Sequence, residues 1–458
     1  MKNKITLILG LLLILGFTNV NAQSEDESPI NHGIVNQQLG IHQSITQNSV
    51  KPTSNASKGD YGNTPNLNWK GQFGGSAFDN ITAVVSDASG NIYVTGSFYD
   101  QMSLNSATYT STGIREAFVA KISNTGSLVW LTQIPASANN QTYSNDICMD
   151  ANGNLFVTGY YTGAITVGAS NLPNVNDFSM FYTKLNNQGQ LQNGAYHSQV
   201  INEIGLYIDV DAIGNIYISV TMYQSATSRH PSWLLKFNSS NTQVYANQYD
   251  VGFNDFVIDG NSIYYSGVIQ NGDNGYIDAN LTLPQPVSYN DVFIAKSDLN
   301  GVFDWGFIGA HPGNGDSMDD RIDIDNSSNL YLAGTFRTSI AFGLDTINQQ
   351  QGNFVAKFDT LGNAQWLKAQ DASDIGLTSD NSGNVYTLSN NSIIKYNSAG
   401  NVIWNNAISI QPQTIDYSSS GKIITVGDKN GYNFVTQNSS IAAQEWITQF
   451  GALVQNRM

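Results

Sequence analysis

The residues best suited to do chemistry are charged side chains placed two or four positions before a recurring aspartate. Asp209 and Asp323 stand two residues before that aspartate in their copies of the pattern. Asp146, Asp255 and Arg321 stand four residues before it. Because side chains alternate along a strand with a period of two, both positions lie on one strand face, so carboxylates from several strands can converge.

Converging carboxylates can bind Ca²⁺, which takes oxygen ligands, or accept hydrogen bonds from the hydroxyls of a sugar. A simpler interpretation is that they lie at a solvated channel mouth or pair with Arg321, without a ligand. The ligand-binding candidates are therefore Asp146, Asp209, Asp255, Arg321 and Asp323. A calcium site at Asp209 and Asp323 is the one cofactor that the sequence suggests.

No residue set for catalysis can be recognised. His197, His230 and His311 are isolated, and neither a His-Glu-x-x-His nor a Gly-x-Ser-x-Gly motif occurs. Cys148 is the single cysteine, so it has no ligand partner of its own kind and cannot form an intramolecular disulfide. The sequence therefore predicts no catalytic residue and favours a protein that is not an enzyme.

A short turn with an aspartate organises the whole chain. Its first copy is Asp87-Ala-Ser-Gly90-Asn91, followed by the alternating run Ile-Tyr-Val-Thr. An aspartate side chain can accept hydrogen bonds from the amides of a tight turn, and Gly or Asn can adopt the positive φ that such turns need. A structural role is expected for the turn aspartates Asp87, Asp150, Asp211, Asp325 and Asp380.

Variants of this turn recur about every 55 residues, which is typical of a repeat protein. They align on Asn91, Asn154, Asn215, Asn261, Asn329, Asn384 and Lys422. Most copies continue with an apolar cluster that ends in a lysine, as at Lys121, and with a turn glycine five residues later. In four copies a tryptophan follows that glycine: Trp130, Trp305, Trp366 and Trp404.

Four short strands per copy, seven copies and almost no helical period predict an all-β fold, a β-propeller of seven four-stranded blades. A single propeller domain is expected over residues 66–458. The sequence Trp-Lys-Gly-Gln-Phe-Gly at residues 69–74 resembles Trp-Ile-Thr-Gln-Phe-Gly at residues 446–451. Either copy could close the ring as a fourth strand, and closure matters because an open array exposes apolar faces and unpaired edges.

These motifs resemble the bacterial β-propeller repeat family abbreviated SBBP and, more loosely, the NHL-type propellers, which share an Asp-x-x-Gly-Asn-Ile-Tyr-Val core. The likeness covers residues 66–451. It implies that the strand before the Asp turn lines the central channel and that the Trp-bearing strand is outermost. It carries no catalytic residue set.

The N-terminus has the pattern of a secretory signal peptide at residues 1–22, with Lys2 and Lys4, an apolar run and a small-residue cleavage site before Gln23. The apolar run is too short to span a bilayer comfortably. Residues 23–65 are polar and lack a sustained period, so a disordered linker or pro-segment is expected. The signal peptide looks like those of exported proteins of Bacteroidetes-type bacteria, which implies a secreted, cell-surface or periplasmic protein.

The charge balance limits the partners. Nineteen basic residues stand against 35 acidic ones, and the net charge of −16 repels nucleic acid phosphates and anionic membrane surfaces. We expect a monomer that binds an extracellular glycan, a peptide or a surface protein, without nucleic acid and without membrane insertion after signal cleavage.

Three functions remain open. The first is an exported, non-enzymatic binding or scaffold module that uses loops on one rim, built from the inserts at residues 101–115, 162–177, 267–290 and 335–352. The second is a propeller enzyme, acting on a polysaccharide or as a quinone-dependent dehydrogenase. The third is a structural or adhesive module of a larger surface assembly.

Overall fold

The structure is a computed structural model that describes residues 65–442, except residues 76–78, 105–106, 198–201, 223–231, 271–272, 274, 285–289, 312–315, 371–375 and 430–431. The signal peptide expected at residues 1–22, nearly all of the linker expected at residues 23–65 and the terminal copy at residues 446–451 lie outside these residues. Among the described residues, no helix is long and apolar enough to cross a membrane.

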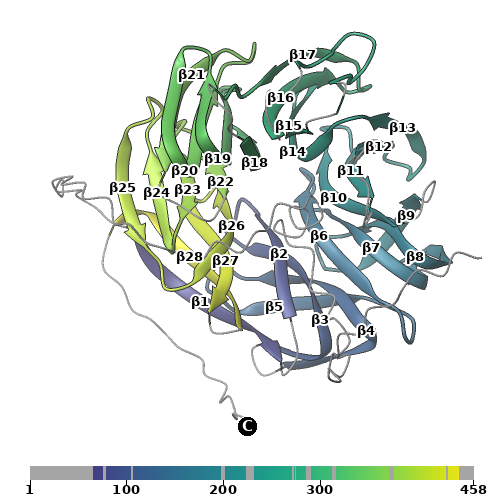
Figure 1. The fold of residues 1–458 in the computed structure, drawn as a ribbon. Helices are drawn as coiled ribbons and strands as arrows, with labels where there is room; N and C mark the ends of the chain where they lie inside the picture. The colour runs from purple at the N-terminus through teal and green to yellow at the C-terminus, as the bar shows by residue number, and fades with distance from the viewer. Residues whose placement is uncertain are drawn as a thin grey trace, which may run out of the picture.

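Seven antiparallel units of four strands surround a central axis and form a β-propeller (Figure 1). Blade one contains β2 (Asp79–Ser86), β3 (Ile92–Leu104), β4 (Ala107–Ile122) and β5 (Leu128–Ile134). Blade two contains β6 (Thr142–Met149), β7 (Leu155–Val167), β8 (Ser170–Leu185) and β9 (Leu191–His197). Blade three contains β10 (Glu203–Val210), β11 (Ile216–Met222), β12 (Ser232–Phe237) and β13 (Gln243–Tyr249).

The other blades follow the same order. Blade four contains β14 (Gly252–Asp259), β15 (Ser262–Gln270), β16 (Asn290–Asp298) and β17 (Phe303–Ile308). Blade five contains β18 (Asp316–Ile324), β19 (Leu330–Phe342), β20 (Asp345–Phe358) and β21 (Ala364–Gln370). Blade six contains β22 (Leu377–Ser379), β23 (Val385–Ser389), β24 (Ser392–Tyr396) and β25 (Val402–Ala407). Blade seven contains β26 (Gln411–Ser418), β27 (Lys422–Lys429), β28 (Tyr432–Ala442) and, from the other end of the chain, β1 (Pro65–Gly75).

The N-terminal strand closes the ring. β1 pairs antiparallel with β28, with Trp69 opposite Gln437 and Phe73 opposite Asn433. The last two residues of β1, Gly74 and Gly75, also pair with β3, so blades seven and one form one eight-stranded sheet. Of the two similar terminal sequences, the copy at residues 69–74 therefore occupies the fourth-strand position in this structure.

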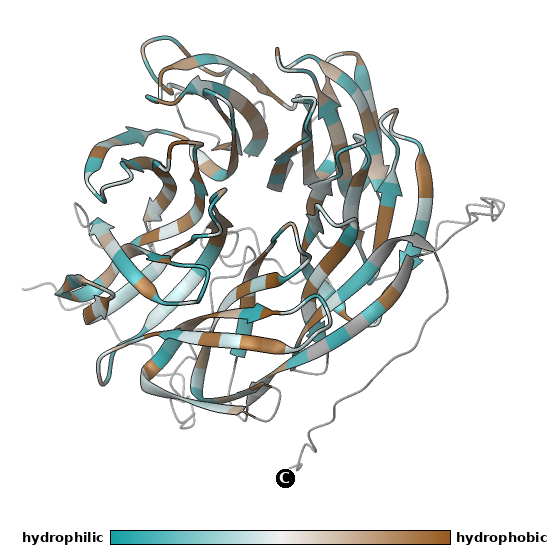
Figure 2. Ribbon diagram, turned by 180° about the vertical axis from the view of Figure 1, so that it is seen from behind, coloured by the Kyte–Doolittle hydropathy of each residue, from teal (hydrophilic) through white to brown (hydrophobic). Residues whose placement is uncertain are grey.

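The hydrophobic core lies between the blades. The second strands are buried over continuous runs, as at the start of β7, whereas the outermost β5 is only partly buried along most of its length. A strand covered on both faces by neighbouring sheets has no solvent face, so it needs apolar residues at successive positions. Figure 2 shows the hydrophobic residues recurring along the strands of every blade.

A bulge in the inner strand explains the glycine that often ends the second strand. In blade two the pairing register shifts between Ser144 and Asp146, beside Gly159. A Cβ atom added to Gly159 would lie 1.8 Å from the carbonyl oxygen of Tyr143, and the matching distances are 2.0 Å at Gly96 and 2.1 Å at Gly267. Only glycine permits this close approach of two backbones.

We predict that Gly159→Ala lowers the free energy of unfolding by roughly 1–3 kcal/mol, because the new methyl group must push the inner strand away from its partner. The control is Gly252→Ala, whose Cβ would meet only an atom 3.5 Å away. That change should stay within about 0.5 kcal/mol of the parent protein. Urea denaturation of both variants measures the difference, and equal stabilities would contradict the bulge argument.

Candidate functional site

The strands that carry the candidate residues line the central channel. β2, β6, β10, β14, β18, β22 and β26 each stand at the inner end of their unit, with a strand partner on one side only (Figure 1). Alternate N–H groups on the side facing the axis therefore have no strand partner, and buried N–H groups without an acceptor are costly.

The inner-strand carboxylates accept these N–H groups and connect neighbouring blades. Val210 N–H donates to Asp209 Oδ1 (2.8 Å), and Ile258 N–H of blade four donates to Asp209 Oδ2 (3.0 Å). Asp255 repeats the arrangement, with Phe256 N–H at 2.9 Å and Ile322 N–H of blade five at 3.3 Å. Each carboxylate thus holds its own strand and the inner strand of the next blade.

Hydrogen bonds from the next blade to an inner-strand carboxylate recur at three further interfaces. Ile208 N–H of blade three donates to Asp146 Oδ2 (2.9 Å). Asp323 accepts hydrogen bonds from both the backbone and the side chain of Ser379 in blade six. Asp416 of blade seven accepts from Ser86 Oγ of blade one (2.5 Å). The sequence prediction missed Asp416, although it stands two residues before Ser418, which replaces the turn aspartate in the seventh copy.

Arg321 faces this ring of carboxylates from blade five. Its guanidinium carbon lies 5.5 Å from the ring centroid of Tyr207 in blade three. Its positive charge opposes the rise in pKa of Asp146 and of Asp255, which places the arginine among the carboxylates of blades two to four. The structure therefore brings Arg321 close to two of the four acidic candidates.

The expected calcium ligands bind different partners. Asp209 accepts an N–H group of β14, whereas Asp323 accepts hydrogen bonds from Ser379 in β22. The described part of the chain holds no group of three His, Cys, Asp or Glu side chains arranged to bind a metal ion.

Dense packing of the inner strands changes the titration of these carboxylates. Burial raises the pKa of Asp146 to about 7 and the pKa values of Asp209, Asp323 and Asp416 to about 6. The pKa of Asp255 is also raised well above its ordinary value by burial. Hydrogen bonds from N–H groups act in the opposite direction without offsetting the burial. Each of these residues is nevertheless partly exposed as a whole.

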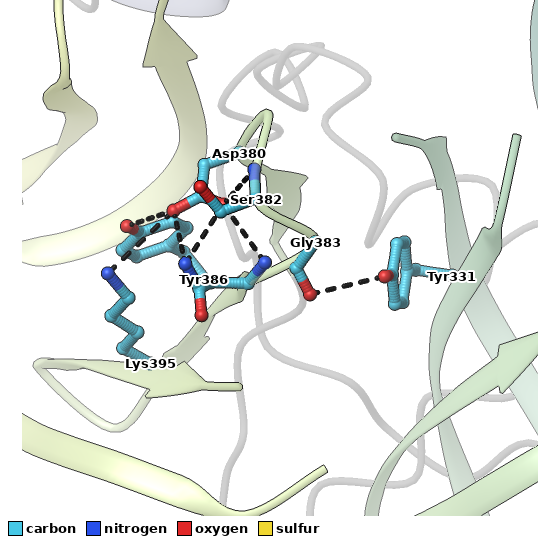
Figure 3. A network of polar contacts seen from close by, with 7 residues as sticks. Tyr331, Asp380, Ser382, Gly383, Tyr386 and Lys395 are labelled. Atoms are coloured by element: carbon cyan, nitrogen blue, oxygen red, sulfur yellow. Dashed lines mark hydrogen bonds and ion pairs between the residues drawn. The ribbon is translucent and has the colours of Figure 1, made fainter. Parts of the chain in front are cut away.

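The turn aspartates lie at one rim of the propeller. Asp380 Oδ1 accepts N–H groups of Ser382 and Asn384, both at 2.9 Å (Figure 3). Its Oδ2 accepts Tyr386 OH at 2.9 Å and lies 3.7 Å from Lys395 Nζ. The carboxylate thus joins the turn to the second and third strands of its blade, which accounts for the Asp, Asn, Tyr and Lys of the repeat.

The other turn aspartates have the same geometry. Asp87, Asp150, Asp211 and Asp325 each accept the N–H group of the residue two positions on and that of the repeat asparagine. Burial disfavours the charge of Asp87, Asp325 and Asp380, but the hydrogen bonds outweigh it and hold their pKa values below the ordinary range. Tyr331 OH also donates to the carbonyl of Gly383 in the next blade (3.3 Å; Figure 3).

A buried histidine cluster has the residue types of a catalytic triad but not its geometry. His311 Nε2 lies 3.0 Å from Ser317 Oγ and 3.3 Å from Asp291 Oδ1, while Nδ1 contacts the carbonyl oxygen of Ser339. In a triad the acid and the nucleophile contact different ring nitrogens. Ser317 Oγ also accepts the N–H group of Val292 (2.6 Å), and all three side chains are buried. The cluster joins blades four and five.

The opposite rim carries three ordered hairpins where the sequence suggested loops. β3 and β4 stay paired out to Leu104 and Ala107, β7 and β8 to Val167 and Ser170, and β19 and β20 to Phe342 and Asp345. The inserts at residues 101–115, 162–177 and 335–352 are thus extensions of the blades. Strand pairing satisfies their backbone groups, and alternation of exposed and half-buried residues in β4 continues through the extension.

The comparisons with known proteins give no family. No family model matches the chain, and no curated protein matches it. The Pan2 WD40 domain of Neurospora crassa is similar over 78% of this chain and 89% of that chain, with 10% identity and a TM-score of 0.46. BamB from Moraxella catarrhalis is similar over 79% of this chain and 83% of that chain, with 10% identity and a TM-score of 0.36. A Dyadobacter fermentans protein of unknown function is similar over 82% of this chain and 99% of that chain, with 9% identity and a TM-score of 0.43. The propeller architecture rests on the strand pairing of this chain.

We predict that the protein is more stable at pH 5 than at pH 8. The channel carboxylates have pKa values above the unfolded value of 3.8, so their contribution to stability is fully present below pH 4 and is lost as the pH rises through 6 to 7. The pKa values of the turn aspartates Asp87, Asp325 and Asp380 lie below the ordinary value, so these groups do not change charge in this interval. Melting temperatures at the two pH values measure the effect.

The matched variants are Asp209→Asn and Asp304→Asn. The first removes a titrating group from the channel, so the difference in melting temperature between pH 5 and pH 8 should shrink. The second changes an exposed carboxylate of the outer strand β17 and should leave that difference as it is. An unchanged difference in Asp209→Asn would refute the assignment.

Proposed function

We propose that this protein is an exported, non-enzymatic binding or scaffold module that recognises a glycan, a peptide or a cell-surface protein through its hairpin-bearing rim. The observation that carries the proposal is the set of three hairpins that extend beyond the four-stranded template. One face of each extension packs into the core, as at Leu104, Val167 and Phe342, and the opposite face is exposed and available to a ligand. Most of the exposed side chains of these hairpins are Thr, Ser, Asn or Gln, with Asp100, Asp177, Arg337 and Asp345 as the charged exceptions, and this composition favours a glycan.

The hairpins of blades one and two are joined into one platform. The connection between β5 and β6, residues 135–141, lies between them. Ile114 N–H donates to the carbonyl of Asn140 (2.8 Å), and Thr162 N–H donates to that of Gln141 (2.9 Å). Binding surfaces gain affinity when they are rigid before the ligand arrives, because less conformational entropy is lost on binding.

The platform presents hydroxyl and amide groups in a regular row. Thr108, Thr110 and Thr112 are exposed at alternate positions of β4, and Gln101 and Ser103 are exposed on the paired strand β3. Thr110 faces Gln101 and Thr108 faces Ser103 across the hairpin. Such uncharged groups can exchange hydrogen bonds with sugar hydroxyls, and the net charge of −16 disfavours a phosphorylated ligand.

The channel supports a role without catalysis. Every inner-strand carboxylate described above already accepts backbone N–H groups or serine hydroxyls, so none stands ready as a paired acid and base. A polysaccharide-degrading or quinone-dependent enzyme is therefore the weaker alternative. The turn motifs and the signal sequence support placement in the SBBP repeat family and export to the cell surface or medium.

A glycan and peptide array on the mature protein tests the proposal, followed by titration calorimetry with the best ligand. We predict that Thr108→Ala/Thr110→Ala weakens binding about tenfold or more, because two side-chain hydrogen bonds of roughly 1 kcal/mol each are lost. The melting temperature should not change, because both side chains are exposed.

The control for this experiment is Thr125→Ala, an exposed threonine in the turn after β4 at the opposite rim. It should bind the ligand like the parent protein. Retained affinity in the double variant would exclude this hairpin as the binding surface. Turnover of a bound glycan would instead support the enzyme.

A further inference from the structure

We propose that the fourth-strand site of blade seven is built to accept two different strands of this chain: β1, which fills it here, and the segment at residues 446–451. This second segment would act as a reserve closing strand. The register of β1 and the spacing of the repeat both point to this second occupant.

The register shows that β1 takes the place of a standard fourth strand. In blade one, Lys121 of the third strand pairs with Tyr93 on one side and with Trp130 on the other. In blade seven, Gln437 pairs with Ile424 on one side and with Trp69 on the other. Gln437 therefore occupies the lysine position, and Trp69 occupies the tryptophan position of the template.

The chain holds a second tryptophan at the distance that the template requires. Nine residues separate lysine from tryptophan in the pairs Lys121 and Trp130, Lys296 and Trp305, Lys357 and Trp366, and Lys395 and Trp404. Trp446 likewise follows Gln437 by nine residues. In the sequence, residues 446–451 therefore stand at the position that the fourth strand has in those four blades.

The two segments also share the residues that fit the site. Both contain Trp, Gln, Phe and Gly at the same four positions. Phe73 of β1 is 1% exposed and packs against Phe118 of blade one, with ring centroids 6.3 Å apart. It belongs to a cluster with Ile424 and Val435 of blade seven. Phe450 is the matching residue of the second segment, so it carries the side chain that this interface accepts.

One substitution explains why β1 holds the site. The template has a glycine five residues after the lysine, with positive φ, as at Gly126 (85°) and Gly362 (79°). The same position in blade seven is Ala442, and a Cβ atom disfavours the left-handed conformation of that turn. β28 continues as a strand to Ala442, which pairs with Pro65 of β1. The local turn is weakened, so the distant strand takes the site.

A double-mutant cycle on the full chain tests the proposal. Phe450→Ala alone should leave the melting temperature unchanged, and Phe73→Ala should lower it by only a few degrees, because the reserve strand takes over. Phe73→Ala/Phe450→Ala should then lower the melting temperature well beyond the sum of the two single changes. Additive effects would overturn the proposal, and so would complete unfolding of Phe73→Ala alone.

Limited trypsin digestion reports which strand fills the site. Lys70 lies within β1, paired with Thr436 of β28, so cleavage after Lys70 requires that β1 leave. Ala442→Gly restores the template turn and should increase this cleavage several-fold while the protein still melts cooperatively. Ala443→Gly adds a glycine at a position where the template has none. Trypsin should cleave this variant at the same rate as the parent protein. Equal cleavage in the two variants would refute the reserve strand.

Discussion

The ring depends on how the innermost strands satisfy their N–H groups. Every blade ends at the channel in a strand with a free edge, and such an edge needs acceptors or water. At five of the interfaces between blades an aspartate supplies them: Asp146, Asp209, Asp255, Asp323 and Asp416. Each aspartate accepts a hydrogen bond from a residue of the next blade. That donor stands one position later in its own copy of the repeat than the aspartate does in its copy. The carboxylate that satisfies the N–H groups of a strand edge therefore also fixes how the inner strands of two neighbouring blades are aligned along their length.

This role limits the chemistry that the channel can perform. A carboxylate held by N–H groups of two strands cannot turn toward a ligand without exposing those groups, and leaving them without an acceptor has a large cost. The turn aspartates are held in a similar way at one rim, each by two N–H groups of its own turn. Variation between the blades is instead concentrated at the opposite rim, where blades one, two and five carry long hairpins.

The architecture could be predicted from the sequence because each repeated motif is explained by contacts within its own blade. The Asp turn, the lysine and the tryptophan recur in register, and each contacts residues of its own blade. The inner carboxylates were found by their alternation, but their acceptor role was not, because the donors lie in the next blade about 50 residues away or more. Asp416 was missed because Ser418 replaces the turn aspartate of the seventh copy, and the inner-strand positions were counted back from that aspartate. The hairpins were taken for loops, although the alternation in β4 was visible in the sequence.

The closing strand shows the limit of sequence analysis most clearly. Residues 69–74 and 446–451 fit one site equally well by pattern, and only the pairing of β1 with β28 decides between them. Closure by β1 depends on contacts between residues that are far apart in the sequence. Asn68 and its hydrogen-bond partner Gln437, for example, are 369 positions apart. Contacts between such distant positions form slowly, and most of β1 pairs with β28 at the far end of the described chain, with only Gly74 and Gly75 pairing with β3. A fourth strand directly after β28 would close the ring over a short turn. In this structure the ring is instead closed by β1, and Ala442, at the position where other blades have the turn glycine, pairs with Pro65 of that strand.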